Sequence, residues 1–130
     1  MILVDTHVVV WLAFEPQRLS KRARVAIDEA RASGEGLAVC DITLLELTVL
    51  ARKKRIGLEI SLETFLREIE ARFVVLPITG RACVRALELP ARYPKDPADR
   101  VIGATALVEG LALVTADRAI RRSRTVRAIW

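Results

Sequence analysis

Short, uniformly apolar runs separated by helix-patterned segments most strongly constrain the fold of this chain. Five such runs are predicted to be strands: Met1–Val4, Leu37–Cys40, Phe73–Ile78, Leu111–Thr115 and Val126–Trp130. Strands that are apolar throughout, rather than alternating, are typical of a parallel sheet buried on both faces. The pattern therefore predicts an α/β fold with a mostly parallel sheet of about five strands, helices on both faces and Val126–Trp130 at the edge.

The segments between these runs carry start and stop signals of helices. The predicted helices are Val8–Phe14, closed by Pro16; one capped by Ser20 and ended by Gly34-Glu35-Gly36; one from Thr43 to the basic run Arg52–Arg55, stopped by Gly57; one from Ser61 to about Arg72; Thr79–Leu89; one from about Ala98 to Gly110; and a brief one at Arg118–Arg121. Residues 90–97, rich in proline, are predicted to form an irregular loop.

A chain of 130 residues with 52% hydrophobic and 28% charged residues is expected to form one compact domain over residues 1–130. Asp5 and His7 interrupt the first apolar run, so no membrane span is expected. The start lacks the features of a secretory signal, which predicts a cytoplasmic protein. Cys40 and Cys83 form no CxxC pair, so a zinc or redox site has no support, and a disulfide is not expected.

The chain carries a formal net charge of +5, with a sequence pI near 9.9. Its basic residues gather at Lys21-Arg22, at Arg52–Arg55 and in the segment 121–124. Basic surfaces attract polyanions, so nucleic acid is a candidate partner. A solvated face that merely keeps the protein soluble is the alternative interpretation.

Four carboxylates are expected at one edge of the sheet. Asp5 and Asp117 follow predicted strands, Glu46 lies one turn into the helix after the second strand, and Asp99 lies in the first turn of a later helix. Ligands of parallel α/β sheets bind beyond the carboxyl ends of the strands. Two carboxylates 4 Å apart repel by about 4 kcal/mol at an effective dielectric of 20, so such clustering implies a cation. All-oxygen ligands select Mg²⁺ or Mn²⁺, which also bind phosphates.

Each acid also has a structural explanation. Thr43 and Glu46 fit a capping box, Asp99 suits the positive end of a helix dipole, and Asp117 could organise a turn. Asp5 is harder to explain structurally. A carboxylate directly after a buried strand needs a hydrogen-bonding partner, and among its sequence neighbours only Thr6 and His7 could provide one.

Other catalytic centres lack the required residues. His7 is the only histidine, which excludes a two-histidine metal site, and no nucleophile elbow or phosphate-binding loop is present. We interpret His7 as structural and Trp11 as a core residue.

Four segments together resemble the PIN-domain ribonucleases, in particular the VapC-type toxins of toxin-antitoxin pairs. The segments are Ile2-Leu3-Val4-Asp5-Thr6-His7, Ile42-Thr43-Leu44-Leu45-Glu46-Leu47, residues 96–106 from Asp96-Pro97-Ala98-Asp99 to Ala106, and Leu113-Val114-Thr115-Ala116-Asp117-Arg118. The chain departs from common family residues at Cys40, Leu45 and Ala98. None of these departures removes an acid, but they weaken any transfer of a particular RNA target.

This resemblance implies a Mg²⁺-dependent endoribonuclease, with Mn²⁺ as a possible substitute, whose catalytic residues are Asp5, Glu46, Asp99 and Asp117. From their distance to the strand ends, Asp5 and Asp99 are expected to hold the metal most directly, Asp117 to complete the site directly or through water, and Glu46 to orient or deprotonate the attacking water. Thr115, two residues before Asp117, is expected to bond a carboxylate or a metal-bound water. The resemblance also implies products with a 5′-phosphate and a 3′-hydroxyl, an antitoxin partner that enters the acidic groove, and a homodimer.

Two alternatives remain open at this stage. A catalytically silent α/β module could bind RNA or a protein through its basic helices, with the acids acting only as caps. A phospho-acceptor pocket of receiver type would need a lysine after a later strand, and no lysine follows Lys95.

Overall fold

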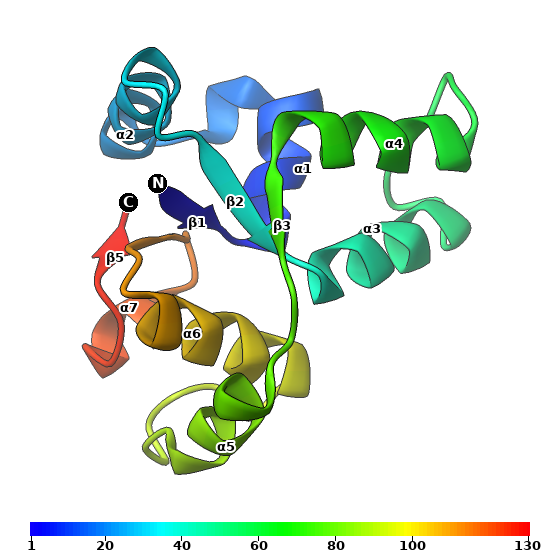
Figure 1. Cartoon of the computed structure of the whole chain (residues 1–130). Coiled ribbons are helices and arrows are strands. Elements are labelled where there is room, and N and C mark those ends of the chain that lie inside the picture. The colour runs from blue at the N-terminus through cyan, green and yellow to red at the C-terminus, as the bar shows by residue number, and fades with distance from the viewer.

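The computed structural model describes all residues from 1 to 130 and contains a single sheet with helices on both faces (Figure 1). The strands are β1 (Ile2–Val4), β2 (Leu37–Cys40), β3 (Val74–Leu76), β4 (Leu113–Val114) and β5 (Ala128–Ile129). The strand order is β3-β2-β1-β4-β5, and every pair is parallel. The predicted α/β class and parallel sheet are confirmed, and β5 lies at the edge as expected.

The helices begin and end close to the predicted signals. They are α1 (Thr6–Phe14), α2 (Lys21–Ala32), α3 (Ile42–Arg52), α4 (Leu62–Arg72), α5 (Gly80–Glu88), α6 (Pro97–Glu109) and α7 (Arg118–Ser123), with a 3-10 turn η1 (Pro16–Arg18) after α1. The hydroxyls of Ser20 and Ser61 accept N–H groups in the first turns of α2 and α4. Gly110, with φ of 66°, ends α6 in the left-handed conformation that glycine adopts easily.

Helix α3 differs from its prediction at both ends. It begins at Ile42, with Asp41 as its N-cap, rather than at Thr43, and it ends at Arg52, the first residue of the basic run, rather than continuing to Arg55. The stop is not Gly57, because Lys54 already adopts a left-handed φ of 57°. The Lys54 N–H donates to the Ala51 carbonyl and the Arg55 N–H to the Leu50 carbonyl. These two bonds form a Schellman motif, with lysine in the position that glycine usually takes.

Strands β3 and β4 are shorter than the apolar runs that predicted them. The Leu111 N–H donates to the Ala106 carbonyl, so this residue closes α6 instead of starting β4. At the end of β3, the Ile78 N–H donates to the Asp41 carboxylate rather than to a neighbouring strand.

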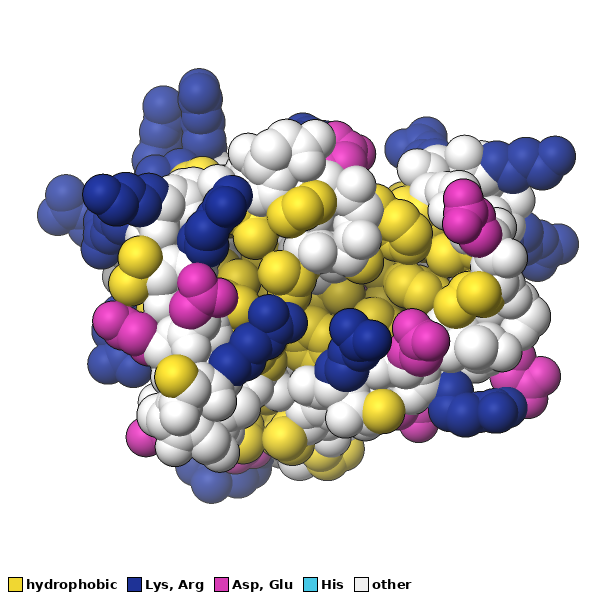
Figure 2. All heavy atoms as spheres, turned by 90° about the horizontal axis from the view of Figure 1, so that it is seen from above, with side chains coloured by type: hydrophobic (Ala, Val, Ile, Leu, Met, Phe, Trp, Pro, Cys, Tyr) yellow, Lys and Arg dark blue, Asp and Glu magenta, His cyan; other side chains and the backbone are white.

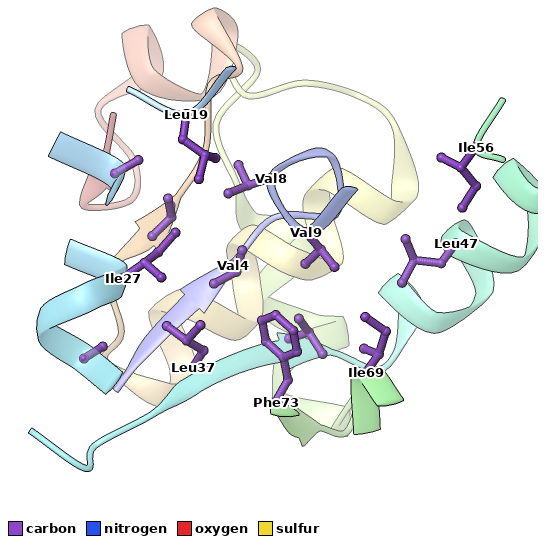
Figure 3. Packing of buried hydrophobic residues seen from close by; sticks show 14 of the residues in the cluster. Val4, Val8, Val9, Leu19, Ile27, Leu37, Leu47, Ile56, Ile69 and Phe73 are labelled. Carbon is purple, nitrogen blue, oxygen red and sulfur yellow. The ribbon is translucent and has the colours of Figure 1, made fainter. Parts of the chain in front are cut away.

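Alternate strand residues serve two separate cores, one on each face of the sheet. Val4, Leu37 and Val39 pack with α1 to α4, as the cluster in Figure 3 shows. Leu3 and Cys40 lie in the other cluster, which α6 and α7 contribute to. These two cores explain why the strand sequences are apolar throughout. Cys40 is buried and Cys83 is exposed, and both are free thiols.

The strand order places a topological switch beside β1. From β1 the sheet extends through β2 to β3 on one side, and the chain then crosses to β4 and β5 on the other. Crevices for ligands form where the strand order reverses. Asp5 directly follows β1, and Asp117 lies shortly after β4. None of the helices has the length and apolar character needed to cross a membrane.

Candidate active site

Asp5 joins the central strand to α1 and is 3% exposed. One carboxylate oxygen, Oδ1, accepts the Thr6 N–H at 2.8 Å, which caps α1. The other oxygen, Oδ2, accepts the Thr115 hydroxyl at 2.8 Å. The partner that the nearby sequence lacks therefore comes from a residue 110 positions away. This bond agrees with the expectation that Thr115 bonds a carboxylate.

His7 holds the backbone beside this carboxylate. Its Nε2 accepts the Ala116 N–H at 2.9 Å, so a neutral ring carries its proton on Nδ1. Nδ1 lies 3.6 Å from Asp5 Oδ2. The ring also packs edge-on against Trp11, with centroids 5.1 Å apart, and Trp11 packs against the core. Both residues take the structural roles expected from the sequence.

Glu46 faces Asp5 across Thr6. The Thr6 hydroxyl donates to Glu46 Oε1 and contacts the Thr43 hydroxyl at 2.9 Å. The capping-box interpretation of Thr43 and Glu46 is therefore wrong, because α3 starts one residue earlier and the Glu46 carboxylate is engaged by α1. Burial raises the pKa of Glu46, the Thr6 hydrogen bond opposes this rise, and the charges of Asp5 and Asp96 add to it.

Asp99 lies in the first turn of α6, where the Asp96 carboxylate caps the helix by accepting the Asp99 N–H at 3.2 Å. Burial, together with the negative charges of Asp5, Asp96, Asp117 and Glu46, raises the pKa of Asp99 to about 7. The structure therefore brings all four predicted acids into one electrostatic environment. Burial is the largest cause of this shift, and a pKa of about 7 leaves Asp99 partly protonated at neutral pH unless a cation is bound.

Asp117 caps α7, because its Oδ1 accepts the Ile120 N–H at 3.0 Å. Its own N–H donates to the Thr115 hydroxyl oxygen at 3.2 Å. Thr115 thus connects Asp117 to Asp5 through one hydroxyl group. The turn expected at Asp117 is the N-cap of α7, and this cap also fixes where the Asp117 carboxylate lies.

The predicted acids converge without forming a closed metal cage. No three acidic, histidine or cysteine side chains stand close enough to chelate one ion. The donor set is nevertheless purely carboxylate, which suits a hard divalent cation.

Three further residues shape this site without having been singled out in the sequence. Thr6 bonds Glu46, and the Tyr93 hydroxyl donates to the Asp99 carbonyl at 3.2 Å. The Arg100 guanidinium donates to four backbone carbonyls, those of Ala86, Leu89, Pro90 and Tyr93. Thr6 could have been noticed because it directly follows Asp5, whereas nothing in the sequence indicates the tertiary contacts of Tyr93.

The acids, their order along the chain and the sheet that gathers them can now be compared with known proteins. The family model for the PIN domain matches residues 2–125. The chain belongs to the PIN-domain family.

This PIN domain is similar to Ribonuclease VapC22 of Mycobacterium tuberculosis, at 41% identity over 98% of this chain and 95% of that protein. Among solved structures, a toxin-antitoxin complex from Klebsiella pneumoniae contains a chain with 26% identity and a TM-score of 0.60, covering 90% of this chain and 87% of that one. The DNA-bound VapBC from Salmonella typhimurium gives a TM-score of 0.71 at 22% identity, over 98% of this chain and 97% of that one. This last likeness concerns the fold.

Proposed function

We propose that this PIN domain is a divalent-metal-dependent endoribonuclease, using Mg²⁺ or Mn²⁺, and the toxin of a toxin-antitoxin pair. The observation that carries the proposal is the shared environment of four carboxylates, in which the pKa of Asp99 rises to about 7. Such a cluster is relieved by a bound cation. The 41% identity to a named ribonuclease supports RNA as the substrate. RNA degradation of this kind would take place in the cytoplasm.

Asp5, Asp99 and Asp117 are the proposed metal ligands. Asp5 is held rigidly by Thr6 and Thr115, and Asp117 by the first turn of α7. Burial, together with the acidic neighbours, raises the pKa of Asp99, so a nearby cation would stabilise its charged form. When bound, the ion would neutralise these acids, orient the scissile phosphate and stabilise the charge that develops on it.

Glu46 is the proposed base for the attacking water. Burial raises the pKa of Glu46, which makes its carboxylate a stronger proton acceptor. In the proposed hydrolysis the water oxygen bonds to phosphorus, the water proton passes to Glu46, and the bond from phosphorus to the 3′ oxygen breaks. The 3′ oxygen takes a proton from solvent, which leaves 5′-phosphate and 3′-hydroxyl ends. The Thr6 hydroxyl holds Glu46 toward Asp5 for this step.

An antitoxin is the proposed protein partner, supported by similarity to a chain of a toxin-antitoxin complex. Away from the acids, α1 and α4 flank a hollow lined largely by apolar residues: Val9, Leu12, Ala13, Phe65, Ile69 and Phe73. Figure 2 shows hydrophobic side chains gathered in the centre of this face, with charged side chains around them. Such a hollow suits an apolar segment of a partner.

A homodimer is the proposed assembly of the chain alone. Large apolar side chains are exposed on α3, at Leu45 and Val49, and on α5, at Val84 and Leu87. Leu87 is 87% exposed, which is unfavourable for a residue that no partner covers. Sedimentation equilibrium should give twice the chain mass, and Leu87→Glu should shift the protein toward monomer.

RNA cleavage with matched variants tests the proposed activity. Wild type should cleave RNA only with Mg²⁺ or Mn²⁺, Asp99→Asn should lose cleavage, and Asp28→Asn, an exposed carboxylate on α2, should retain it. Calorimetry with Mg²⁺ or Mn²⁺ distinguishes the proposed nuclease from a catalytically silent binding module. Metal binding that is lost in Asp99→Asn supports the nuclease, whereas the lack of any metal binding by wild type would contradict it.

A further inference from the structure

An open hollow of about 550 Å³ at α7, the helix that Asp117 caps, is lined by four arginines and no other residue: Arg118, Arg121, Arg122 and Arg124. All four side chains are exposed, and they belong to α7 or directly follow it. None forms an ion pair within the chain, since the side-chain ion pairs involve Arg18, Arg67 and Arg85. Four unpaired guanidinium groups facing one hollow repel each other until an anion binds.

A second hollow continues the first along the sheet edge. Arg121 and Arg124 line both, and the second adds Arg22 and Trp130. The cationic surface therefore extends from α7 past β5 toward α2 (Figure 1). An elongated track of cations with an aromatic ring is typical of surfaces that follow a single nucleic-acid strand.

Other arginines near the site are occupied by the fold, which separates them from this cluster. Arg100 donates to backbone carbonyls before α6, and Arg92 Nε donates to the Ser123 carbonyl at 2.7 Å. The basic run at the end of α3 is different again, because the hollow beside it is mainly apolar. The α7 arginines are thus available to a ligand and have no structural task of this kind.

The position of α7 connects this cluster to the acids. Asp117 caps α7, and Arg121 lies about 6 Å further along the helix axis at 1.5 Å per residue. A cluster of carboxylates repels the phosphates of any RNA, so affinity for the strand has to come from cations outside it. Guanidinium groups bind phosphate oxygens in pairs, which suits arginine rather than lysine in this role.

We propose that Arg118, Arg121, Arg122 and Arg124, continued by Arg22, bind the phosphates of a single RNA strand that flank the cleaved bond. This inference rests on the proposed nuclease function and names where the substrate strand runs. The cluster positions the strand and takes no part in the chemical step.

Binding of a labelled single-stranded RNA in EDTA tests the track without cleavage. The variant Arg121→Gln/Arg122→Gln removes two charges from the last turn of α7, and Arg52→Gln/Lys53→Gln removes two at the end of α3 as a matched control. Each phosphate contact to a single strand contributes about 0.7 to the slope of log affinity against log salt, so the α7 variant should lose about 1.4 and bind at least tenfold more weakly. The α3 control variant should keep at least two-thirds of the wild-type slope of log affinity against log salt.

Two results would overturn the track. The first is equal RNA affinity and equal salt slope in the α7 variant and the α3 control. The second is an α7 variant that loses affinity for polyglutamate but not for RNA, which would indicate an acidic protein partner instead. Failure of the proposed nuclease function would look different. Wild type would then cleave no RNA with Mg²⁺ or Mn²⁺, even if it bound RNA in EDTA. With cleavage present, the α7 variant should raise KM and leave kcat within about twofold of wild type.

Discussion

A Cβ atom on Gly103 would lie 2.1 Å from the Tyr93 hydroxyl oxygen and 2.6 Å from its ring carbon Cζ. Tyr93 is 1% exposed, and its hydroxyl donates to the Asp99 carbonyl in the first turn of α6. Burial raises the pKa of Tyr93, and the charges of Asp5, Asp99 and Asp117 add to this, so the phenol stays a donor. The lack of a side chain at Gly103 therefore lets Tyr93 support the helix that carries Asp99.

Gly103→Ala should destabilise the protein, because the new methyl group must displace Tyr93. Overpacking of this kind costs about 1–3 kcal/mol of unfolding free energy. Urea unfolding measures the change. Gly80→Ala is the control, since a Cβ there meets no atom within 4 Å. A Gly103→Ala protein as stable as the Gly80→Ala control would contradict the packing described.

Asp99→Asn should stabilise the metal-free protein increasingly as pH rises. The pKa of Asp99 is about 7 in the folded chain against an ordinary value of 3.8. Between these values the folded state binds a proton that the unfolded state releases, so wild-type stability falls as pH rises through this window. Asparagine carries no charge and removes that loss. Melting temperatures in EDTA should show a larger advantage of Asp99→Asn at pH 8 than at pH 5, and an equal advantage at both would refute the shift.

Thr115→Val should weaken metal binding and lower stability. The fully buried hydroxyl donates to Asp5 and accepts the Asp117 N–H, so valine leaves the Oδ2 atom of the buried Asp5 carboxylate without its hydroxyl donor. The expected cost is about 1–3 kcal/mol. Thr115→Ser keeps the hydroxyl and should retain metal affinity by calorimetry within a few-fold. Identical metal affinity in the valine and serine variants would show that the hydroxyl does not orient the acids.

His7 should carry its proton on Nδ1 when neutral, because Nε2 accepts the Ala116 N–H. Nitrogen NMR of the single histidine at alkaline pH measures this directly. A signal for the Nε2–H tautomer would be inconsistent with the bond to Ala116. His7→Phe should weaken the loop before Asp117, because it removes the acceptor of the Ala116 N–H.

The sequence predicted elements best where the deciding interactions are local. Apolar runs marked the strands, and Ser20, Ser61 and Gly110 marked helix ends, because a cap depends on residues within one turn. Helix α3 was misjudged because Lys54 adopts the left-handed conformation expected of a glycine. Backbone strain of this kind has no compositional signal.

The candidate site was predictable as a set of acids but not as a set of contacts. Strand ends and helix starts located Asp5 and Asp117 near one edge. The bond from Thr6 to Glu46 spans 40 positions, and nothing between them in the sequence indicates it. The support of Asp99 by Tyr93 likewise depends on how the proline-rich loop folds back on α6. Long-range hydroxyl and phenol contacts are therefore what the structure adds.

The 110-residue separation of Asp5 and Thr115 has a consequence for protein synthesis. A nascent chain that stops before β4 carries Asp5 but lacks Thr115 and Asp117, so its centre is incomplete however well the first helices fold. Translation must continue beyond Asp117 before the proposed nuclease can exist. A ribosome-bound chain therefore cannot cleave the message that encodes it until β4 and the residues after it have emerged.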